Sequence, residues 1–256
     1  MSAGLMQKQL FLCSNMDELK TQKDNIVKTV RNSGYALVRN LFDAASLREK
    51  LKTVFHYANT MQHRGTTGVL PQEIRTNMSK WSIGGHSASQ ANIARLMLTI
   101  YNPLFQPDQF QLHADFEKLI AVRDILANRT PLGDDQLLPT HFNACRLQLY
   151  PAGGGFMGKH TDSRGVTTLQ ETGHQENYIQ LVLLLTQKEK DFHSGGAFVS
   201  HNNVILDSEE SSLTGDVLVY DGMTDHGVAD IDSDSPLNLQ NLKGRVVALA
   251  TIYNNR

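Results

Sequence analysis

The feature that most constrains the fold is a succession of short β-favouring segments in the second half of the chain. Between residues 142 and 150, apolar residues alternate with polar ones, as in a strand with one apolar and one polar face. Further runs rich in β-branched, leucine and aromatic residues follow at 179–185, 195–199, 204–206, 217–220 and 245–253. Turn and loop residues separate these runs. Several short strands of this kind predict a jelly roll, in which two sheets pack face to face.

The first half of the chain is mostly helical in its periodicity. Apolar residues with helical spacing predict helices over 16–30, 43–55, 89–100 and 113–127. Residues 35–39 are a predicted strand, and residues 129–139, with two prolines and a glycine, are a predicted connector. We therefore expect a single mainly β domain with some α structure over residues 1–256. In it, residues 1–139 would be a mostly helical support and lid region, and residues 140–256 the core that carries the site.

A polar segment from Gln62 to Gly85 is predicted to be a loop. It contains Arg75 and Trp81 among Gly, Thr, Gln and Asn residues. Its composition favours a surface loop anchored by the tryptophan. The alternative is a lid over a binding site, because loops on a rigid scaffold often carry specificity. In that case Trp81 would supply an aromatic wall, and Arg75 would be a candidate substrate contact.

A glycine-rich stretch after Tyr150 ends in His160-Thr161-Asp162, which suggests a metal site. On an extended chain, residues two apart point to the same side, so this imidazole and this carboxylate could bind one divalent metal. A second histidine would complete a two-histidine, one-carboxylate face with open positions, as in non-haem Fe(II) oxygenases. His226 follows the predicted strand 217–220 and a loop, and it is the preferred third ligand. The alternatives are His174, His193 and His201, which lack this strand–loop context.

Arg245 opens the last β-favouring run of the chain. An arginine beside an otherwise apolar strand costs desolvation free energy unless an anion meets it, and its planar fork suits a carboxylate. A metal face with a nearby arginine therefore suggests a dicarboxylate that binds the metal at one end and Arg245 at the other.

The polar face of the strand at 142–150 carries Arg146, Gln148 and Tyr150. These side chains would line the cavity of a small barrel, or they would face solvent on a half-exposed strand. The sequence leaves both interpretations open. Arg146 and Arg164 are candidate substrate contacts, and Gln148 and Tyr150 are candidate contacts of the dicarboxylate.

The order His-x-Asp, a distant His and a strand-borne Arg resembles the Fe(II)/2-oxoglutarate-dependent dioxygenases. The sequence around these residues is most similar to the prolyl-hydroxylase-like branch, with a Gly-rich turn before His160, Ser194–Phe198 in between, and Gly215-Asp216 before the strand that leads to His226. The resemblance covers roughly residues 140–256. It implies a double-stranded β-helix (jelly-roll or cupin-like) core with N-terminal supporting helices.

By residue, the resemblance implies iron on His160, Asp162 and His226, and the distal carboxylate of 2-oxoglutarate on Arg245. The chain departs from the family pattern by an extra glycine before His-x-Asp, and by Val247 where many relatives have a hydroxyl residue. Thr251 or Tyr150 would then be the second partner of that carboxylate.

The resemblance also implies a reaction. The cofactor would be Fe(II), the co-substrates 2-oxoglutarate and O₂, with ascorbate as a candidate reductant. An unactivated C–H bond would be hydroxylated while 2-oxoglutarate is decarboxylated to succinate and CO₂. Desaturation and cyclisation are related outcomes. Halogenating relatives lack the carboxylate ligand, and here Asp162 is present. Polar loops favour a small polar metabolite, such as a free amino acid or a derivative, and a peptidyl or protein prolyl residue is the alternative substrate.

Two interpretations from other classes remain. The first is a cupin-like metal enzyme that does not use 2-oxoglutarate, in which Arg245 would bind substrate. The second is a silent binding module that keeps the fold. The presence of all four candidate site residues argues against the silent module, because a silent module has no need of all four. These residues are His160, Asp162, His226 and Arg245.

Composition narrows the class of partner. The net charge is −2 with a pI of about 6.5, whereas nucleic-acid and acidic-membrane surfaces usually show a basic excess. No apolar run is long enough for a transmembrane helix, and the first residues do not form a secretory signal. Cys13 and Cys145 are the only cysteines, which fits a reducing compartment. We therefore expect a cytoplasmic enzyme with a small-molecule substrate and neither nucleic acid nor membrane as partner, while its oligomeric state is not readable.

Overall fold

The structure is a computed structural model that describes residues 9–65, 72–84, 93–129, 141–162 and 178–254. Arg164, His174 and most of the predicted connector at 129–139 lie outside these ranges. The model's strands, in chain order, are β1 (Leu10–Leu12), β2 (Tyr35–Arg39), β3 (Ser79–Ile83), β4 (Arg95–Tyr101), β5 (His141–Pro151), β6 (Gly155–His160), β7 (Ile179–Leu184), β8 (Gly196–His201), β9 (Val204–Asp207), β10 (Val217–Asp221), β11 (His226–Ile231) and β12 (Gly244–Asn254).

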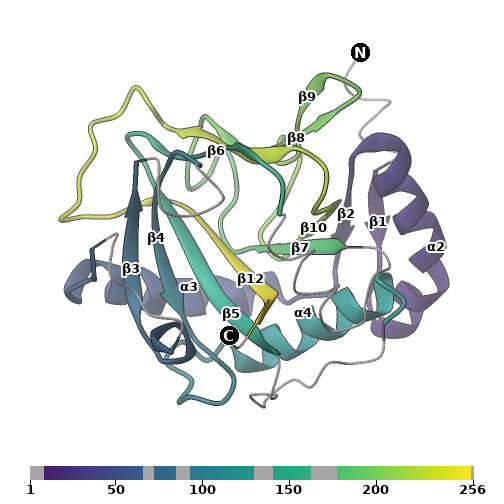
Figure 1. Cartoon of the computed structure of the whole chain (residues 1–256), viewed down its shortest axis with the longest axis horizontal. Coiled ribbons are helices and arrows are strands. Elements are labelled where there is room, and N and C mark those ends of the chain that lie inside the picture. The colour runs from purple at the N-terminus through teal and green to yellow at the C-terminus, as the bar shows by residue number, and fades with distance from the viewer. Residues whose placement is uncertain (1–8, 66–71, 85–92, 130–140, 163–177, 255–256) are drawn as a thin grey trace.

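These strands pair in the order β1-β2-β10-β7-β12-β5-β4-β6-β11-β8-β9, and β3 pairs with β4. In Figure 1, β7, β12 and β5 form a central layer, and β6 and β8 lie above it. β4 connects the two layers because it pairs with β5 along most of its length and with β6 at Arg95 and Leu96. This curled double layer confirms the predicted double-stranded β-helix.

Three helices pack against this sheet: in Figure 1 two of them lie below the central layer, and the first lies at its right-hand end, beside β1 and β2. They are α2 (Met16–Ser33), α3 (Ala44–Thr60) and α4 (His113–Leu126), and all three were predicted. Asn15 begins α2 by accepting hydrogen bonds from the backbone N–H groups of Asp17 and Glu18, and Asp43 begins α3 in the same way. The apolar faces of these helices pack on one face of the sheet. The opposite face of the sheet is free to build a site.

The central layer is buried on both faces, which explains its nearly continuous apolar runs. On β12, Val246 packs with the helices in one core, and Val247 packs between the two sheet layers in a second core. The second core also contains Tyr150, Val182 and Leu218. The candidate site lies in this second core, between the layers.

The predicted helix at 89–100 is wrong in its described part, because residues 95–101 form β4. The apolar residues in this region fit helical spacing, but the run also fits a buried strand, and spacing alone cannot separate the two in so short a segment. The predicted loop at 62–85 is wrong at residues 79–83, which form β3 and place Trp81 opposite Leu98.

The division of the chain at residue 139 stays a prediction. Within the described residues, strands from both sides of this boundary share the sheet. β2 pairs with β10 and β4 pairs with β5. The first part of the chain thus contributes strands as well as helices.

The predicted glycine turn before His160 is confirmed. Gly153 and Gly154 have φ angles of +92° and +112°, a backbone region that side chains other than glycine rarely adopt. A Cβ at Gly153 would also lie 2.5 Å from the backbone of Leu237. This turn reverses the chain from β5 into β6, which carries His160 at its end.

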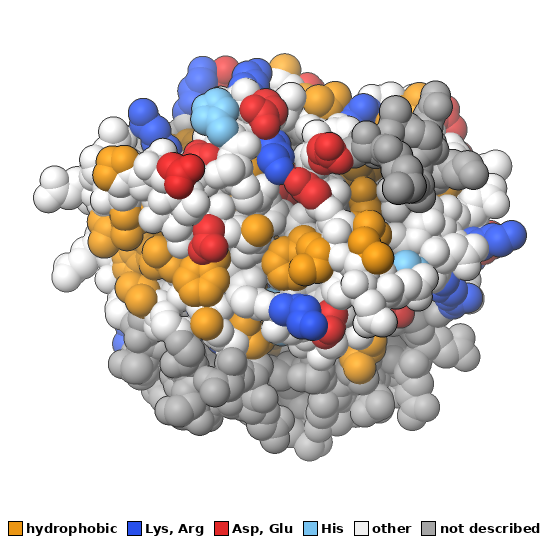
Figure 2. Space-filling view, turned by 90° about the horizontal axis from the view of Figure 1, so that it is seen from above, with side chains coloured by type: hydrophobic (Ala, Val, Ile, Leu, Met, Phe, Trp, Pro, Cys, Tyr) orange, Lys and Arg blue, Asp and Glu red, His pale blue; other side chains and the backbone are white. Residues whose placement is uncertain are grey.

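The molecular surface above the upper layer carries both hydrophobic and charged side chains. Figure 2 shows several groups of hydrophobic side chains there, with acidic and basic side chains between them. Among the described residues, none of the helices has the length and apolar character needed to cross a bilayer.

Candidate metal centre and pocket

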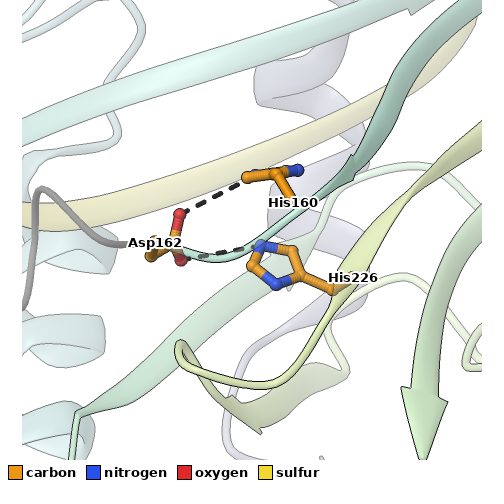
Figure 3. A group of neighbouring side chains, drawn as sticks. All are labelled: His160, Asp162 and His226. Carbon is orange, nitrogen blue, oxygen red and sulfur yellow. Dashed lines mark ion pairs between the residues drawn. The ribbon is translucent and has the colours of Figure 1, made fainter. Parts of the chain in front are cut away.

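His160, Asp162 and His226 lie together at the edge of the upper layer (Figure 3). His160 ends β6 and His226 begins β11, and the two are directly paired across these antiparallel strands. Asp162 Oδ1 is 3.8 Å from His160 Nε2, and Asp162 Oδ2 is 3.6 Å from His226 Nε2. The candidate ligand atoms all lie within 4.8 Å of one another. Two imidazole nitrogens and one carboxylate this close together form a donor set that suits non-haem iron.

Backbone carbonyl groups orient both imidazoles. His160 Nδ1 lies 2.9 Å from the carbonyl oxygen of Gly158, and His226 Nδ1 lies 2.8 Å from that of Thr224. A carbonyl oxygen only accepts, so Nδ1 carries the proton in each ring and Nε2 keeps its lone pair for a metal. The Asp162 backbone N–H donates to the carbonyl oxygen of Gly222 at 2.7 Å, which fixes the chain at the third candidate ligand.

Burial sets the protonation of these groups. It lowers the pKa of His226 and of His160, and for His160 the neighbouring His226 lowers the pKa further. Burial also raises the pKa of Asp162, while His160 and Arg146 act in the opposite direction. Imidazoles with a lowered pKa are neutral at neutral pH, which is the form that binds a metal.

The triad opens into a pocket between the two sheet layers. Arg146, Gln148 and Tyr150 line it from β5, so the polar face of this strand points inward. The remaining lining residues are Met157, Gln180, Val182, Ala197, Phe198, Val199, Leu218, Tyr220, Gly227, Val228, Arg245, Val247 and Leu249. The pocket thus combines an apolar wall with a few convergent polar groups, as small-molecule sites do.

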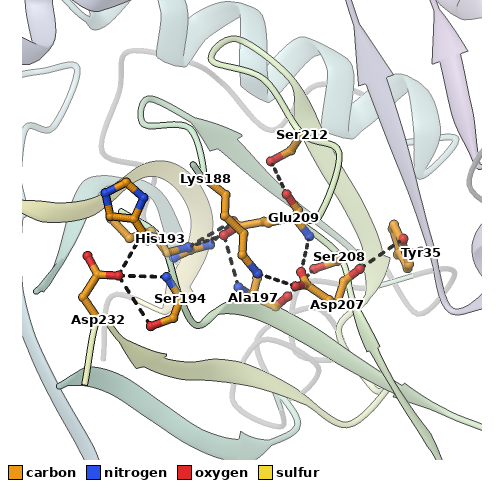
Figure 4. A network of polar contacts seen from close by, with 11 residues as sticks. Tyr35, Lys188, His193, Ser194, Ala197, Asp207, Ser208, Glu209, Ser212 and Asp232 are labelled. Carbon is orange, nitrogen blue, oxygen red and sulfur yellow. Dashed lines mark hydrogen bonds and ion pairs between the residues drawn. The ribbon is translucent and has the colours of Figure 1, made fainter. Parts of the chain in front are cut away.

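Arg245 lines this pocket, but a carboxylate of the chain already meets it. Its Nε lies 3.0 and 2.8 Å from the two carboxylate oxygens of Glu209, and its Nη2 lies 2.6 Å from Oε1. Both side chains are almost fully buried. Glu209 also accepts from the backbone N–H of Ala197 at 3.2 Å (Figure 4). Among the described residues, no acceptor meets Nη1 of Arg245, so one donor group of the guanidinium remains for a ligand.

The other predicted site residues are placed as follows. Tyr150 donates to Gln148 Oε1 at 2.9 Å, and its ring lies under the Arg245 guanidinium. Thr251 does not line the pocket but accepts from Gln180 Nε2 at 3.3 Å. Trp81 packs against the helix-side core and Arg75 lies over the Phe142 ring, so neither lines the pocket. The roles predicted for all these residues stay predictions.

Sequence reasoning missed two polar residues that line the pocket, Tyr220 and Gln180, and the residue that pairs with its Arg245, Glu209. Tyr220 stacks near His226, with ring centroids 4.5 Å apart. Gln180 interrupts an apolar run, and a polar residue in a doubly buried strand was a usable signal. Glu209 gave no such signal, because it lies in a polar stretch without periodicity.

The fold and the pocket together define a jelly-roll protein with a two-histidine, one-carboxylate centre between its sheets. No family model and no curated protein matches the chain. Several solved protein structures, in contrast, match the chain in fold. A Pseudomonas putida prolyl-4-hydroxylase matches with a TM-score of 0.50 and 14% identity, over 90% of this chain and 98% of that one.

A second similar structure is SnoN, a non-haem α-ketoglutarate-dependent epimerase from nogalamycin biosynthesis. It matches with a TM-score of 0.56 and 11% identity, over 91% of this chain and 82% of that one. Its complex with Fe³⁺, α-ketoglutarate and nogalamycin RO matches with a TM-score of 0.52 and 10% identity, over 90% and 84%. At such low identity these likenesses establish the shared fold, the double-stranded β-helix.

Proposed function

We propose that this chain is an Fe(II)- and 2-oxoglutarate-dependent oxygenase. It would hydroxylate an unactivated C–H bond of a small polar metabolite, such as a free amino acid or a derivative. The observation that carries the proposal is the convergence of His160, Asp162 and His226 at a pocket that also contains Arg245. When bound, iron and 2-oxoglutarate would supply O₂ activation coupled to decarboxylation to succinate and CO₂.

The residues of the chain have separate tasks in this proposal. His160 and His226 present Nε2 and Asp162 its carboxylate, so the protein occupies one side of the metal and leaves the pocket side open. Arg245 would hold the distal carboxylate of 2-oxoglutarate through Nη1, while Glu209 fixes its other donors. The apolar wall would exclude water from the reacting C–H bond.

Two similar structures bear on the substrate class. The similar prolyl-4-hydroxylase is consistent with a peptidyl substrate, and the complex of SnoN with nogalamycin RO is consistent with a small molecule. The pocket places charged and amide side chains among apolar ones, which favours a small polar molecule.

A second candidate function has one specific observation in its favour. Glu209 already neutralises Arg245, so this arginine attracts a further carboxylate less strongly than an unpaired one would. A metal-dependent enzyme of the same fold that does not use 2-oxoglutarate would not need an arginine that is free to bind the distal carboxylate of 2-oxoglutarate. The two candidates differ in whether 2-oxoglutarate binds.

The test is an anaerobic titration of the Fe(II)-loaded protein with 2-oxoglutarate, followed by the weak visible metal-to-ligand charge-transfer band. We expect the wild type to develop the band, His160→Ala to abolish it, and Arg245→Ala to weaken it. Arg31→Ala, on the exposed side of α2, is the matched control and should behave as the wild type. Bound iron without a band in the wild type would refute the use of 2-oxoglutarate and favour the second candidate.

A further inference from the structure

Arg146 is a buried cation of the pocket without a counter-ion in the described parts of the chain. It is 9% exposed and lines the pocket from β5. Its Nη1 is shut off from solvent and has no hydrogen-bond acceptor. The ring of Tyr253, 5.1 Å from the guanidinium carbon, offsets only part of this, because a cation–π contact is weaker than a buried ion pair. A buried donor without an acceptor costs stability.

Two other buried arginines of the described chain are paired with carboxylates. Arg245 is paired with Glu209. Arg123 donates to Asp124 at 2.9 Å and also to Asn143 and to the Ala250 carbonyl oxygen. Nη2 of Arg123 and both Nη atoms of Arg129 are also buried without an acceptor, but both of these arginines lie within 4 Å of Asp124. Arg146 has no such carboxylate among the described residues, and it lines the pocket that contains the metal triad.

Burial lowers the pKa of the Arg146 guanidinium, whereas Tyr253, Tyr101 and then Asp162 raise it. Arg146 and Asp162 line the same pocket, although the two form no ion pair. Asp162 is also a candidate metal ligand. Once it binds a divalent cation, its charge is more than compensated by the metal. Arg146 would then face a net positive centre, so the loaded protein needs an anion at Arg146 more than the metal-free protein does.

Arg146 and Arg245 lie at different positions along the paired strands β5 and β12. In the β5–β12 pairing, Arg146 lies opposite Leu249 and Arg245 lies opposite Tyr150. The two arginines are therefore four positions apart along the strands, about 13 Å at the rise of a β-strand. Arg146 and Asp162 influence each other's pKa without an ion pair, whereas Arg245 is ion-paired with Glu209. Arg146 thus lies at the end of the pocket that contains the candidate metal ligands, and Arg245 lies at the deep end.

We propose that Arg146 binds a carboxylate of the substrate, so that the substrate is a free carboxylic acid. This inference rests on the proposed function, in which the carboxylates of 2-oxoglutarate are matched to the metal and to Arg245 and leave Arg146 for another molecule. The planar fork of arginine suits a carboxylate in a bidentate arrangement. An internal residue of a peptide offers an amide at this position, so the same arginine selects against it.

The experiment compares N-acetylated amino acids with their primary amides, which differ by one negative charge. Each is titrated into the anaerobic Fe(II)·2-oxoglutarate complex, and binding is measured by the change in the charge-transfer band and by equilibrium dialysis. We expect the wild type to prefer acids by about 10- to 100-fold, the range of a charge-assisted hydrogen-bond pair. Arg146→Gln should remove the preference, and Arg146→Lys should keep part of it. Arg31→Gln is the control.

Several outcomes would overturn the inference. These are equal binding of acids and amides by the wild type, no binding of any acid, or a preserved preference in Arg146→Gln. Weaker 2-oxoglutarate binding in Arg146→Gln, with acid preference intact, would assign Arg146 to the co-substrate instead. Each is distinct from failure of the proposed function, which appears earlier, as a missing band in the wild type.

Stability provides a second readout. Because Arg146 lacks a partner, we expect Arg146→Gln to unfold at the same or a higher denaturant concentration than the wild type. A clear loss of stability would show that Arg146 has a structural task and would overturn the inference.

Discussion

Glu209→Gln tests whether the buried pair with Arg245 is needed for the fold. The substitution keeps the shape of the side chain but removes its charge, leaving the Arg245 guanidinium buried without a counter-ion. Breaking a buried ion pair by removing one partner costs about 3–5 kcal/mol. The glutamine oxygen can still accept from Arg245 and from Ala197, so we expect the lower end, about 3 kcal/mol. In a chain of this size that corresponds to a fall in Tm of roughly 6–12 °C.

The assay is urea unfolding followed by circular dichroism. Glu49→Gln is the matched control, because it makes the same chemical change in the exposed Lys52–Glu49 pair, where the loss should stay below about 1 kcal/mol. The double variant Glu209→Leu/Arg245→Met should recover most of the loss, since it removes both charges. Saturating Fe(II) and 2-oxoglutarate should raise the Tm of Glu209→Gln more than that of the wild type, because the ligand supplies the missing negative charge. A free energy of unfolding for Glu209→Gln that matches the control would refute the reasoning.

Three further predictions concern the core and the metal centre. Burial raises the pKa of Cys145 from 9.0 to about 12, so its thiol should resist alkylation at pH 8 until the protein unfolds. Above about pH 9 the thiol ionises in the unfolded state but not in the folded state, which lowers the stability of the wild type. Cys145→Ala should weaken this loss of stability. Burial lowers the pKa of His226 from 6.5, so its contribution to metal-free stability should be present at pH 7 and be lost as the pH falls below about 6.5, a trend that thermal melts of His226→Asn should flatten. A Cβ at Gly222 would lie 2.1 Å from the Tyr178 ring, so Gly222→Ala should shift the backbone that holds Asp162 and weaken Zn(II) binding in calorimetry. Gly65→Ala should not, because no atom of the described residues lies within 4 Å of its Cβ position.

The sequence predicted the elements whose pattern has only one interpretation. The helices that contain Leu19 and Leu47 have long amphipathic stripes and capping residues before them, and both are present. The strands at 142–150, 179–185 and 245–253 are also present, because β-branched and apolar runs of that length seldom pack as helices. Residues 95–101 were predicted wrongly, since a short apolar run has no periodicity that excludes a helix.

The candidate site was predictable where chemistry and chain spacing coincide. His160 and Asp162 are two residues apart on an extended chain, so their common direction follows from local geometry. His226 is brought to them by the pairing of β6 with β11, and neither of these strands was predicted from the sequence; only its place after a strand and a loop indicated it. The pocket-facing side of β5 stayed open in the sequence, because alternation shows that two faces differ but not which one faces solvent.

Glu209 shows why the counter-ion of a buried charge escapes prediction from sequence. Desolvation cost requires that Arg245 meet an anion, but that requirement does not say whether the anion is a ligand or a residue. A ligand can come and go, whereas Glu209 is permanent, so its presence changes the pocket from one with a strong free cation at its deep end to one with a neutral pair. Arg146 then becomes the cation at which a ligand's charge matters most. The selectivity of the pocket for anions should therefore be lost in Arg146→Gln, and be kept or increased in Glu209→Gln, in which the positive charge of Arg245 is released rather than removed.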